Sequence, residues 1–261
     1  MKSPINVPFG SYRRHAAYSQ SDLKTVLQSP ERLYEQKHIR RFAPSKETPA
    51  MFMGTLLHTA ILEPERFHCD YAVCPPRNTK AGKEKAAELE RELITPMTAA
   101  QAEIADQIMQ RVNTNDLVNN LLMTGEPEVS FFDVAPETGL AIKGRLDWLT
   151  ASGVVIDVKT VGEGKAGPHD FSKQIANFRY HMQAAHYLKL AAAERFVFIA
   201  VEREPNYGIG VYELDAPALA EGAALRRKAL RLIADCEESG VWPGYTPEIQ
   251  TLSLPSWGYD N

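Results

Sequence analysis

The first half of the chain has the hydrophobic spacing of helices. In YSQSDLKTVLQSPERLYEQ, the residues Leu23, Val26 and Leu27 fall on one helical face. Ser19 or Ser21 stands just before this face, where a hydroxyl can cap the first turn. This segment therefore predicts an amphipathic helix close to the N-terminus.

Further segments complete the helical half. Pro30 begins a second predicted helix, and we expect a loop at 40–50 because this stretch is polar and contains proline. MFMGTLLHTAILEPERF resumes the helical spacing until Pro64 ends it. The strongly charged segment 77–92 predicts a solvated or mobile stretch, followed by a helix at about 98–112.

Beyond Gly125 the pattern changes to that of strands. EVSFFDV, LAIKGRLDWL and VVIDVKT are divided by APETG and TASG, which predicts an antiparallel meander. Two helical runs follow, then the strand-like runs FVFIAVE and GIGVYEL and a last helix at about 216–238. These elements predict an α/β (α+β) fold with a mixed central sheet flanked by helices.

No linker divides the chain, so we expect one domain over 1–261. Its parts are a helical region at about 1–125, the sheet with its helices at about 126–240, and an irregular tail at 241–261. Hydrophobic residues make up 44 % and charged residues 24 % of the chain, which is ordinary for a globular protein with a real core.

Charge and cysteine content exclude some functions. A formal net charge of −4 argues against general polyanion binding, although a basic groove on an acidic surface is compatible with it. Cys69, Cys74 and Cys236 form no C-x-x-C pair and are too few for a four-thiolate metal site. No apolar run reaches the roughly 18 residues of a membrane span, and the N-terminus lacks a signal-peptide core. We expect a cytoplasmic protein.

The stretch GRLDWLTASGVVIDVKT carries the candidate chemistry. In a strand, Asp157 and Lys159 share one face, and we expect the other face, with Val158, to pack into the core. The T-A-S-G turn folds Asp147 back beside Asp157, where two carboxylates repel unless a cation lies between them. Mg²⁺ held by these oxygens fits, with Lys159 placed to orient or deprotonate a water and to stabilise a phosphorane.

A simpler interpretation is a salt bridge of Lys159 with Asp157 or Asp147 on a half-exposed sheet. From these residues alone both interpretations stay open, because D-x-K is a short and common string.

The wider context resembles a known family. Asp, then D-x-K ten residues later, resembles the PD-(D/E)XK nuclease superfamily. MGTLLHTAILEPERF, PEVSFFDVAPETGLAIKGRLDWL, VVIDVKT, YHMQAAHYLKL and the tail LSLPSWGYDN resemble, in this order, its RecE-like or lambda-type exonuclease branch. The resemblance covers most of the chain and implies a restriction-endonuclease-like core. It departs from many members in having Asp at 157 instead of Glu.

Carried over by position, the resemblance implies a metal site. Asp147, Asp157, the carbonyl of Val158 and His58 of G-T-x-x-H become metal ligands, and Lys159 becomes the catalytic lysine. It implies two Mg²⁺ ions, with Mn²⁺ as a substitute.

Other positions match more loosely. Glu128 lies in the strand before Asp147, where an acidic supporting role and a structural role are both open. Gln183 and Tyr187 lie one helical turn apart, and the family helix lies beside the metals; packing alone is the alternative. The candidates for binding DNA or its 5′-phosphate are Arg14, Ser21 and Lys24. For Ser21, a simple helix cap is the alternative.

The implied activity is 5′→3′ degradation of linear double-stranded DNA to 5′-mononucleotides, leaving 3′ overhangs for recombination by strand annealing. The resemblance also implies a phage or prophage origin in a bacterial host, a ring of three or four subunits, and a RecT- or Beta-type annealing partner. The alternatives are an endonuclease or repair nuclease of the same fold and a catalytically silent DNA-binding protein.

Overall fold

A five-stranded sheet forms the centre of the computed structural model, which describes residues 5, 7–40, 48–255 and 258. The strands stand in sequence order: β3 (Gly125–Val134), β4 (Ala141–Thr150), β5 (Val154–Val161), β6 (Arg195–Glu202) and β7 (Ile209–Glu213). Only β5 and β6 run parallel; the other neighbours are antiparallel. This mixed sheet confirms the predicted fold class and the predicted meander.

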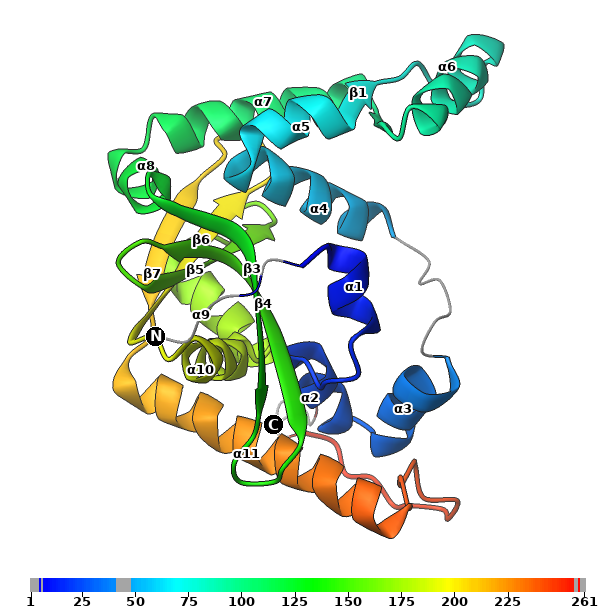
Figure 1. Cartoon of the computed structure of the whole chain (residues 1–261), viewed down its shortest axis with the longest axis vertical. Helices are drawn as coiled ribbons and strands as arrows, with labels where there is room; N and C mark the ends of the chain where they lie inside the picture. The colour runs from blue at the N-terminus through cyan, green and yellow to red at the C-terminus, as the bar shows by residue number, and fades with distance from the viewer. Residues whose placement is uncertain (1–4, 6, 41–47, 256–257, 259–261) are drawn as a thin grey trace.

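Helices cover both faces of the sheet (Figure 1). On one face lie α4 (Pro49–Leu62), α7 (Ala99–Asn113) and α8 (Asp116–Leu122). On the other lie α9 (Pro168–Asn177), α10 (Tyr180–Ala191) and α11 (Ala216–Ser239), joined by α2 (Gln20–Val26) and α3 (Pro30–Tyr34). The chain is a three-layer structure with the sheet in the middle.

Each helical layer encloses its own hydrophobic core. Ile156 and Val158 of β5 belong to the core under α4 and α7, as the alternation predicts. Val155 and Val161, on the face of Asp157, are also fully packed, in the core under α10 and α11. The expectation that only one face of this strand packs is therefore wrong, because helices cover the sheet from both sides and leave Asp157 buried.

Local sequence signals set the helix starts. Ser19 and Asp22 form a capping box at α2, in which the Ser19 N–H donates to Asp22 Oδ2 at 2.7 Å. Pro30 is the first residue of α3, and Pro64 begins α5 (Pro64–Asp70) directly after α4. The starts of α2 and α3 agree with the predicted positions, and α4 ends just before Pro64, as predicted; the start of α5 was not predicted.

The charged segment 77–92 differs from its prediction, because most of it forms the helix α6 (Lys80–Arg91). Ala86 and Leu89 pack on Cys74 in a small separate core. Gly82 allows the close approach, since a Cβ there would lie 2.1 Å from the Pro76 carbonyl oxygen. Beside α6, β1 (Tyr71–Val73) and β2 (Thr95–Met97) pair in parallel, and this unit projects from the body (Figure 1).

Other elements have no counterpart in the sequence pattern. They include α1 (Phe9–Arg14), the π-helix η1 (Glu35–Ile39) and also α5, α8, β1 and β2. Residues 41–47 of the predicted loop and part of the tail lie outside the described residues; 241–255 are irregular, as predicted. In the described part of the chain, no helix combines the length and the apolar character needed to cross a membrane.

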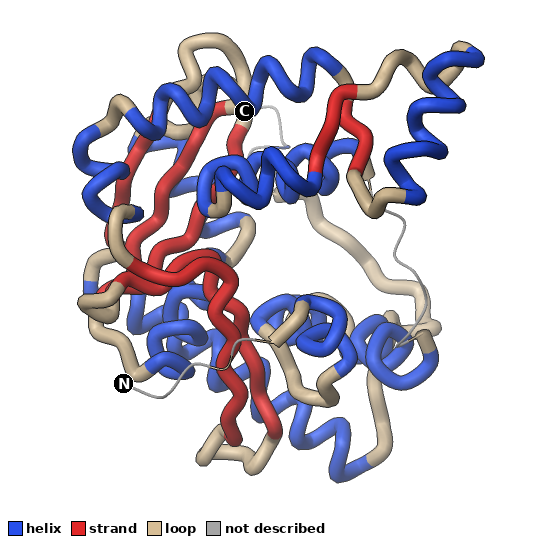
Figure 2. The backbone as a smooth tube through the Cα atoms, turned by 45° about the horizontal axis from the view of Figure 1, so that its top comes forward, coloured by secondary structure: helices blue, strands red, loops and turns tan. Residues whose placement is uncertain are grey.

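The β3–β4 hairpin extends far beyond the rest of the sheet and twists as a long ribbon (Figure 2). The N-terminal segment runs along it: Ile5 pairs with Ser130, and Tyr18 pairs with Ile142. We call residues 7–15 the N-terminal arm. Together with α2, the arm faces α4 across a cleft.

Candidate active site

The candidate catalytic residues gather where β4 and β5 separate. The two strands pair only near their turn, and the pairing ends at Trp148↔Ile156. Beyond that pair, the Val158 N–H donates to Asp147 Oδ2 at 2.9 Å. In a strand the N–H and carbonyl of one residue face the same side, so the Val158 carbonyl also faces this gap. Continued by one pair, the register places Asp147 opposite Asp157, and the two carboxylates are close enough to interact.

Asp157 is fully buried and has a partner for each oxygen. Gln183 Nε2 donates to Asp157 Oδ1 at 2.5 Å, and Lys159 Nζ lies 2.6 Å from Asp157 Oδ2. Lys159 Nζ also lies 4.6 Å from the ring centre of Tyr180. The alternative interpretation was a salt bridge on a half-exposed sheet. The Asp157–Lys159 pair exists, but the expected exposure is wrong, because the Asp157 side chain is only 1 % exposed.

The electrostatics of the gap are dominated by burial. Burial and the nearby charge of Asp157 raise the pKa of Asp147 to about 7, although His58 and Lys159 oppose this rise. Burial alone lowers the pKa of Lys159, but the attraction of Asp157 and Asp147 outweighs it, and the net shift is upward. Lys159 is therefore an ammonium that stabilises negative charge rather than a ready base.

On one side of the site, the helix α10 packs against the sheet. Gln183 and Tyr187 both face the sheet and are 5 % and 6 % exposed. Gly144 of β4 allows this close approach, because a Cβ at this position would lie 2.6 Å from Leu190 Cδ1 and 3.1 Å from the Tyr187 ring. Burial first, then Tyr12 and the site carboxylates, raise the pKa of Tyr187 well above its usual value, so its hydroxyl stays protonated.

His58 approaches from the opposite layer, on α4. Its Nδ1 lies 3.6 Å from Asp147 Oδ2. Among the described residues, no three His, Cys, Asp or Glu side chains stand close enough to hold an ion by themselves. His58 therefore stands beside the carboxylates without closing a cage.

The donor set nevertheless fits Mg²⁺. The gap offers oxygens of the buried Asp157, of the partly exposed Asp147 and of a strand carbonyl. After burial, the charge of Asp157 is the main cause of the raised pKa of Asp147, and a cation would neutralise this charge. Mg²⁺ is usually held by one or two carboxylates, waters and substrate phosphates rather than by an all-protein cage.

A large cleft of about 1680 Å³ opens on Asp147. Asp147, His58 and Glu128 lie in its lining, with Tyr187 at its base. Cationic side chains on several elements also line it: Arg13, Arg14, Lys37, Arg66, Lys143 and Arg145. Five carboxylates line it as well: Asp22, Glu63, Glu126, Glu128 and Asp147. The lining is therefore of mixed charge, and the basic groove stays a prediction.

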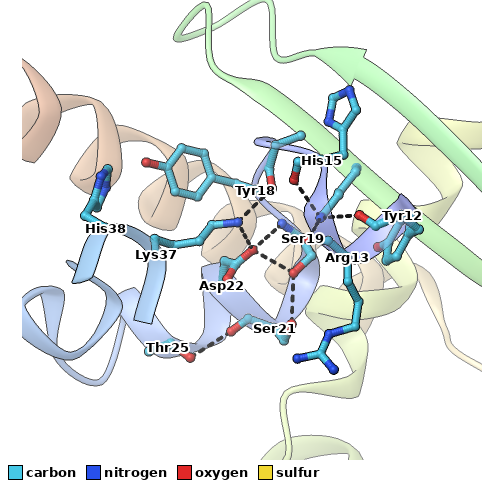
Figure 3. A network of polar contacts seen from close by, with 12 residues as sticks. Tyr12, Arg13, His15, Tyr18, Ser19, Ser21, Asp22, Thr25, Lys37 and His38 are labelled. Atoms are coloured by element: carbon cyan, nitrogen blue, oxygen red, sulfur yellow. Dashed lines mark hydrogen bonds and ion pairs between the residues drawn. The ribbon is translucent and has the colours of Figure 1, made fainter. Parts of the chain in front are cut away.

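Two of the three candidate phosphate contacts lie at the α1–α2 side of this cleft. Arg14 and Ser21 line it directly, and Ser21 Oγ lies 2.9 Å from Ser19 Oγ. Figure 3 shows Ser21 and Ser19 next to the ion pair of Lys37 with Asp22. The helix cap belongs to Ser19, so the alternative role of Ser21 as the cap is wrong.

Lys24 lies near Lys159 rather than in the lining of the cleft. Burial lowers its pKa, and the positive charges of Lys159 and Arg179 add to the effect. Its Nζ lies 5.6 Å from the ring centre of Phe178. Lys24 and Lys159 are far apart in the sequence, so no local sequence pattern could have predicted that they lie close together.

Two residues of the site escaped the sequence analysis. On β4, Lys143, Arg145 and Asp147 alternate along one face. Arg145 forms an ion pair with Glu128, and both line the cleft. The alternation K-x-R-x-D was the available signal, because three charged residues on one face of a central strand are unusual.

The architecture and the arrangement of Asp147, Asp157 and Lys159 are those of a PD-(D/E)XK-type nuclease fold. A family match of the sequence agrees with this assignment. Residues 19–255 match the family described as "PDDEXK-like domain of unknown function (DUF3799)". The chain belongs to this family. No curated protein sequence matches it significantly.

Among solved structures, the chain is similar to a protein from Eubacterium rectale named "Putative exonuclease", at 15 % identity and a TM-score of 0.64, over 96 % of each chain. A phage-related exonuclease from Haemophilus somnus 129PT has 12 % identity and a TM-score of 0.38, over 86 % of this chain and 96 % of the other. An alkaline exonuclease from Laribacter hongkongensis has 14 % identity and a TM-score of 0.35, over 87 % and 93 %.

The family match confirms the predicted resemblance to the PD-(D/E)XK superfamily. The Eubacterium rectale protein shares the fold over almost the whole of both chains.

Proposed function

We propose that the protein is a divalent-metal-dependent exodeoxyribonuclease that degrades linear double-stranded DNA in the 5′→3′ direction to 5′-mononucleotides. The observation that supports it most is the group of Asp147, Asp157 and Lys159, of which Asp147 lines a large cleft that also carries six cationic side chains. The description of the Eubacterium rectale protein as an exonuclease favours exonuclease activity over endonuclease activity.

Each residue has a defined task in this proposal. Asp147, Asp157 and the Val158 carbonyl would hold Mg²⁺ or Mn²⁺, with His58 beside them. A bound cation supplies Lewis-acid polarisation of the scissile phosphate. Lys159 stabilises the charge that develops on the phosphate oxygens.

Gln183 and Tyr187 act from α10. Gln183 fixes the orientation of Asp157 by donating to its Oδ1. Tyr187 keeps water out of the base of the cleft and holds α10 on Gly144.

Linear and covalently closed circular duplexes, incubated together with Mg²⁺ or with EDTA, test the proposal. We expect loss of the linear duplex only, abolished by EDTA and by Asp157→Asn. Asp170→Asn is the matched control, because Asp170 is an aspartate of α9 that pairs with Lys165 at 3.5 Å outside the site. Nicking of the circle would favour an endonuclease, and inertness toward both would favour a DNA-binding protein.

We further propose that Lys24 contacts the 5′-phosphate, with Arg14 and Ser21 along the approach. A third positive charge beside Lys159 and Arg179 favours an anion at this point. Lys24→Gln should slow degradation of 5′-phosphorylated ends about tenfold and leave 5′-hydroxyl ends unchanged, with Lys83→Gln on α6 as the control. Equal loss on both ends would refute this role.

The remaining proposals rest on the family resemblance. They are a ring of three or four subunits around the duplex, a RecT- or Beta-type annealing partner that receives the 3′ overhang, and work in the cytoplasm of a bacterial host carrying a phage or prophage. Light scattering of the purified protein measures the subunit number; a monomer at all concentrations would refute the ring.

A further inference from the structure

One face of β4 links the N-terminal arm to the acidic site, by which we mean Asp147 and Asp157. Lys143, Arg145 and Asp147 alternate on this face, and Asp147 is the last of the three. Lys143 is 4 % exposed, and its Nζ donates to the carbonyls of Tyr12 at 2.7 Å and His15 at 2.9 Å. Lys143 thus fastens the end of α1 to the strand.

Along β4, Arg145 lies between Lys143 and Asp147. Its Nε donates to Glu128 Oε2. Its Nη1 donates to the Val7 carbonyl at 2.8 Å and to Ser130 Oγ at 3.0 Å. One guanidinium therefore bonds at once to the start of the arm and to a carboxylate of β3.

The arm also covers Arg145 with aromatic rings. The guanidinium carbon lies 5.8 Å from the ring centre of Phe9 and 5.9 Å from that of Tyr12. These are distances at which a cation is attracted to a ring face. The Arg145 side chain is 13 % exposed as a result.

Glu128 has an unusual backbone that brings it to the site. In the β3–β4 register, Pro127 pairs with Trp148 and Val129 with Leu146, so Glu128 stands opposite Asp147. Its φ of 56° takes it out of the ladder between these pairs. A non-glycine residue in this left-handed region is strained and persists only where surrounding contacts hold it. The bond from Arg145 is such a contact.

We propose that Arg145 is a positioning residue that couples the N-terminal arm to the acidic site. It holds Glu128 opposite Asp147 and, with the same guanidinium, holds Val7 and Phe9 over the cleft. The position of the arm and the position of Glu128 therefore depend on each other. This inference deepens the proposed function and rests on it for its effect on activity, whereas the coupling itself requires neither metal nor DNA.

Only arginine can make these contacts together. The planar fork offers donors in fixed directions, so Glu128 and Val7 are bonded from two edges of one group. A lysine keeps the charge but donates from a single point, and it would serve one partner at the expense of the other. Arg145→Lys therefore separates geometry from charge.

Hydrogen exchange of the metal-free protein, followed by mass spectrometry, tests the coupling. We expect Glu128→Gln to speed exchange of amides in residues 8–14 about tenfold, although the substitution lies on β3. Arg145→Lys should do the same, and Arg195→Lys should not, because its partner Glu213 lies on β7 far from the arm. Unchanged exchange in Glu128→Gln would overturn the coupling.

Kinetics and metal titration on the full chain then test the positioning role. For Arg145→Lys we expect kcat on linear duplex to fall about tenfold with KM within twofold, and calorimetric Mg²⁺ affinity to fall about tenfold. Wild-type kcat and Mg²⁺ affinity in this variant would overturn the positioning role. An inactive wild-type protein would refute the proposed function, while the exchange result would still decide whether the arm and Glu128 are coupled.

Discussion

Replacement of Asp147 by asparagine should stabilise the metal-free protein at neutral and alkaline pH. In the folded protein, burial and the charge of Asp157 raise the pKa of Asp147 from 3.8 to about 7. Between these values the unfolded chain has lost the proton that the folded chain keeps, so stability falls as pH rises from about 4 to 7 and then levels off. Asparagine is neutral at every pH and can still accept the Val158 N–H.

The size of the effect follows from the shift. A rise of about three units corresponds to roughly 4 kcal/mol. We take about 2–4 kcal/mol as the expected gain in the free energy of unfolding for Asp147→Asn at pH 8, with a difference near zero at pH 4. Because a bound cation stabilises only the folded state, excess Mg²⁺ should stabilise the wild-type protein much more than the variant.

Urea denaturation in EDTA at several pH values between 4 and 8 measures this difference. Asp170→Asn serves as the control, because neighbouring lysines lower the pKa of Asp170 and its removal gives no gain at high pH. A loss of stability in Asp147→Asn at pH 8, or a difference that is the same at pH 4 and pH 8, would refute the electrostatic account of the gap.

Three other substitutions test the surroundings of the site. Gln183→Leu leaves Asp157 Oδ1 without its donor and should cost about 1–3 kcal/mol in urea denaturation together with most of the nuclease activity; full activity would contradict the orienting role. Gly144→Val should push α10 away and lose at least tenfold in kcat, whereas a wild-type rate would show that the close approach is not needed. Burial lowers the pKa of His186 from 6.5 to about 4, so its contribution to stability is lost as pH falls through this window. His186→Gln should flatten the stability profile there by about 3 kcal/mol, and an unchanged profile would contradict the shift.

The positions of the catalytic candidates could be predicted because they depend on local order. Two strands joined by a short turn bring Asp147 beside Asp157 whatever the rest of the chain does. Strand alternation likewise places Lys159 on the face of Asp157, and helical spacing places Gln183 and Tyr187 on one face. The structure brings these five residues together as expected.

What could not be predicted depends on tertiary contacts. The burial of Asp157 requires helices on both sides of the sheet, which a single strand does not reveal. The charge of Arg145 on the face of Asp147 was visible in K-x-R-x-D, but its contacts with the arm require the folded structure. The left-handed backbone of Glu128 has no sequence signature. The helix at 80–91 has only a narrow apolar face, formed by Gly82, Ala86 and Leu89, within a strongly charged segment. The packing of Gly82 on Pro76 and of Ala86 and Leu89 on Cys74 is tertiary.

The products released from a uniformly labelled linear duplex test the central claim most directly. With Mg²⁺, the wild-type protein should release 5′-mononucleotides from the first minutes, and a duplex labelled at its 5′ ends should lose that label before one labelled at its 3′ ends. Asp157→Asn should release nothing, and Asp170→Asn should match the wild type. Release of longer oligonucleotides, earlier loss of the 3′ label, or activity in Asp157→Asn would contradict the account.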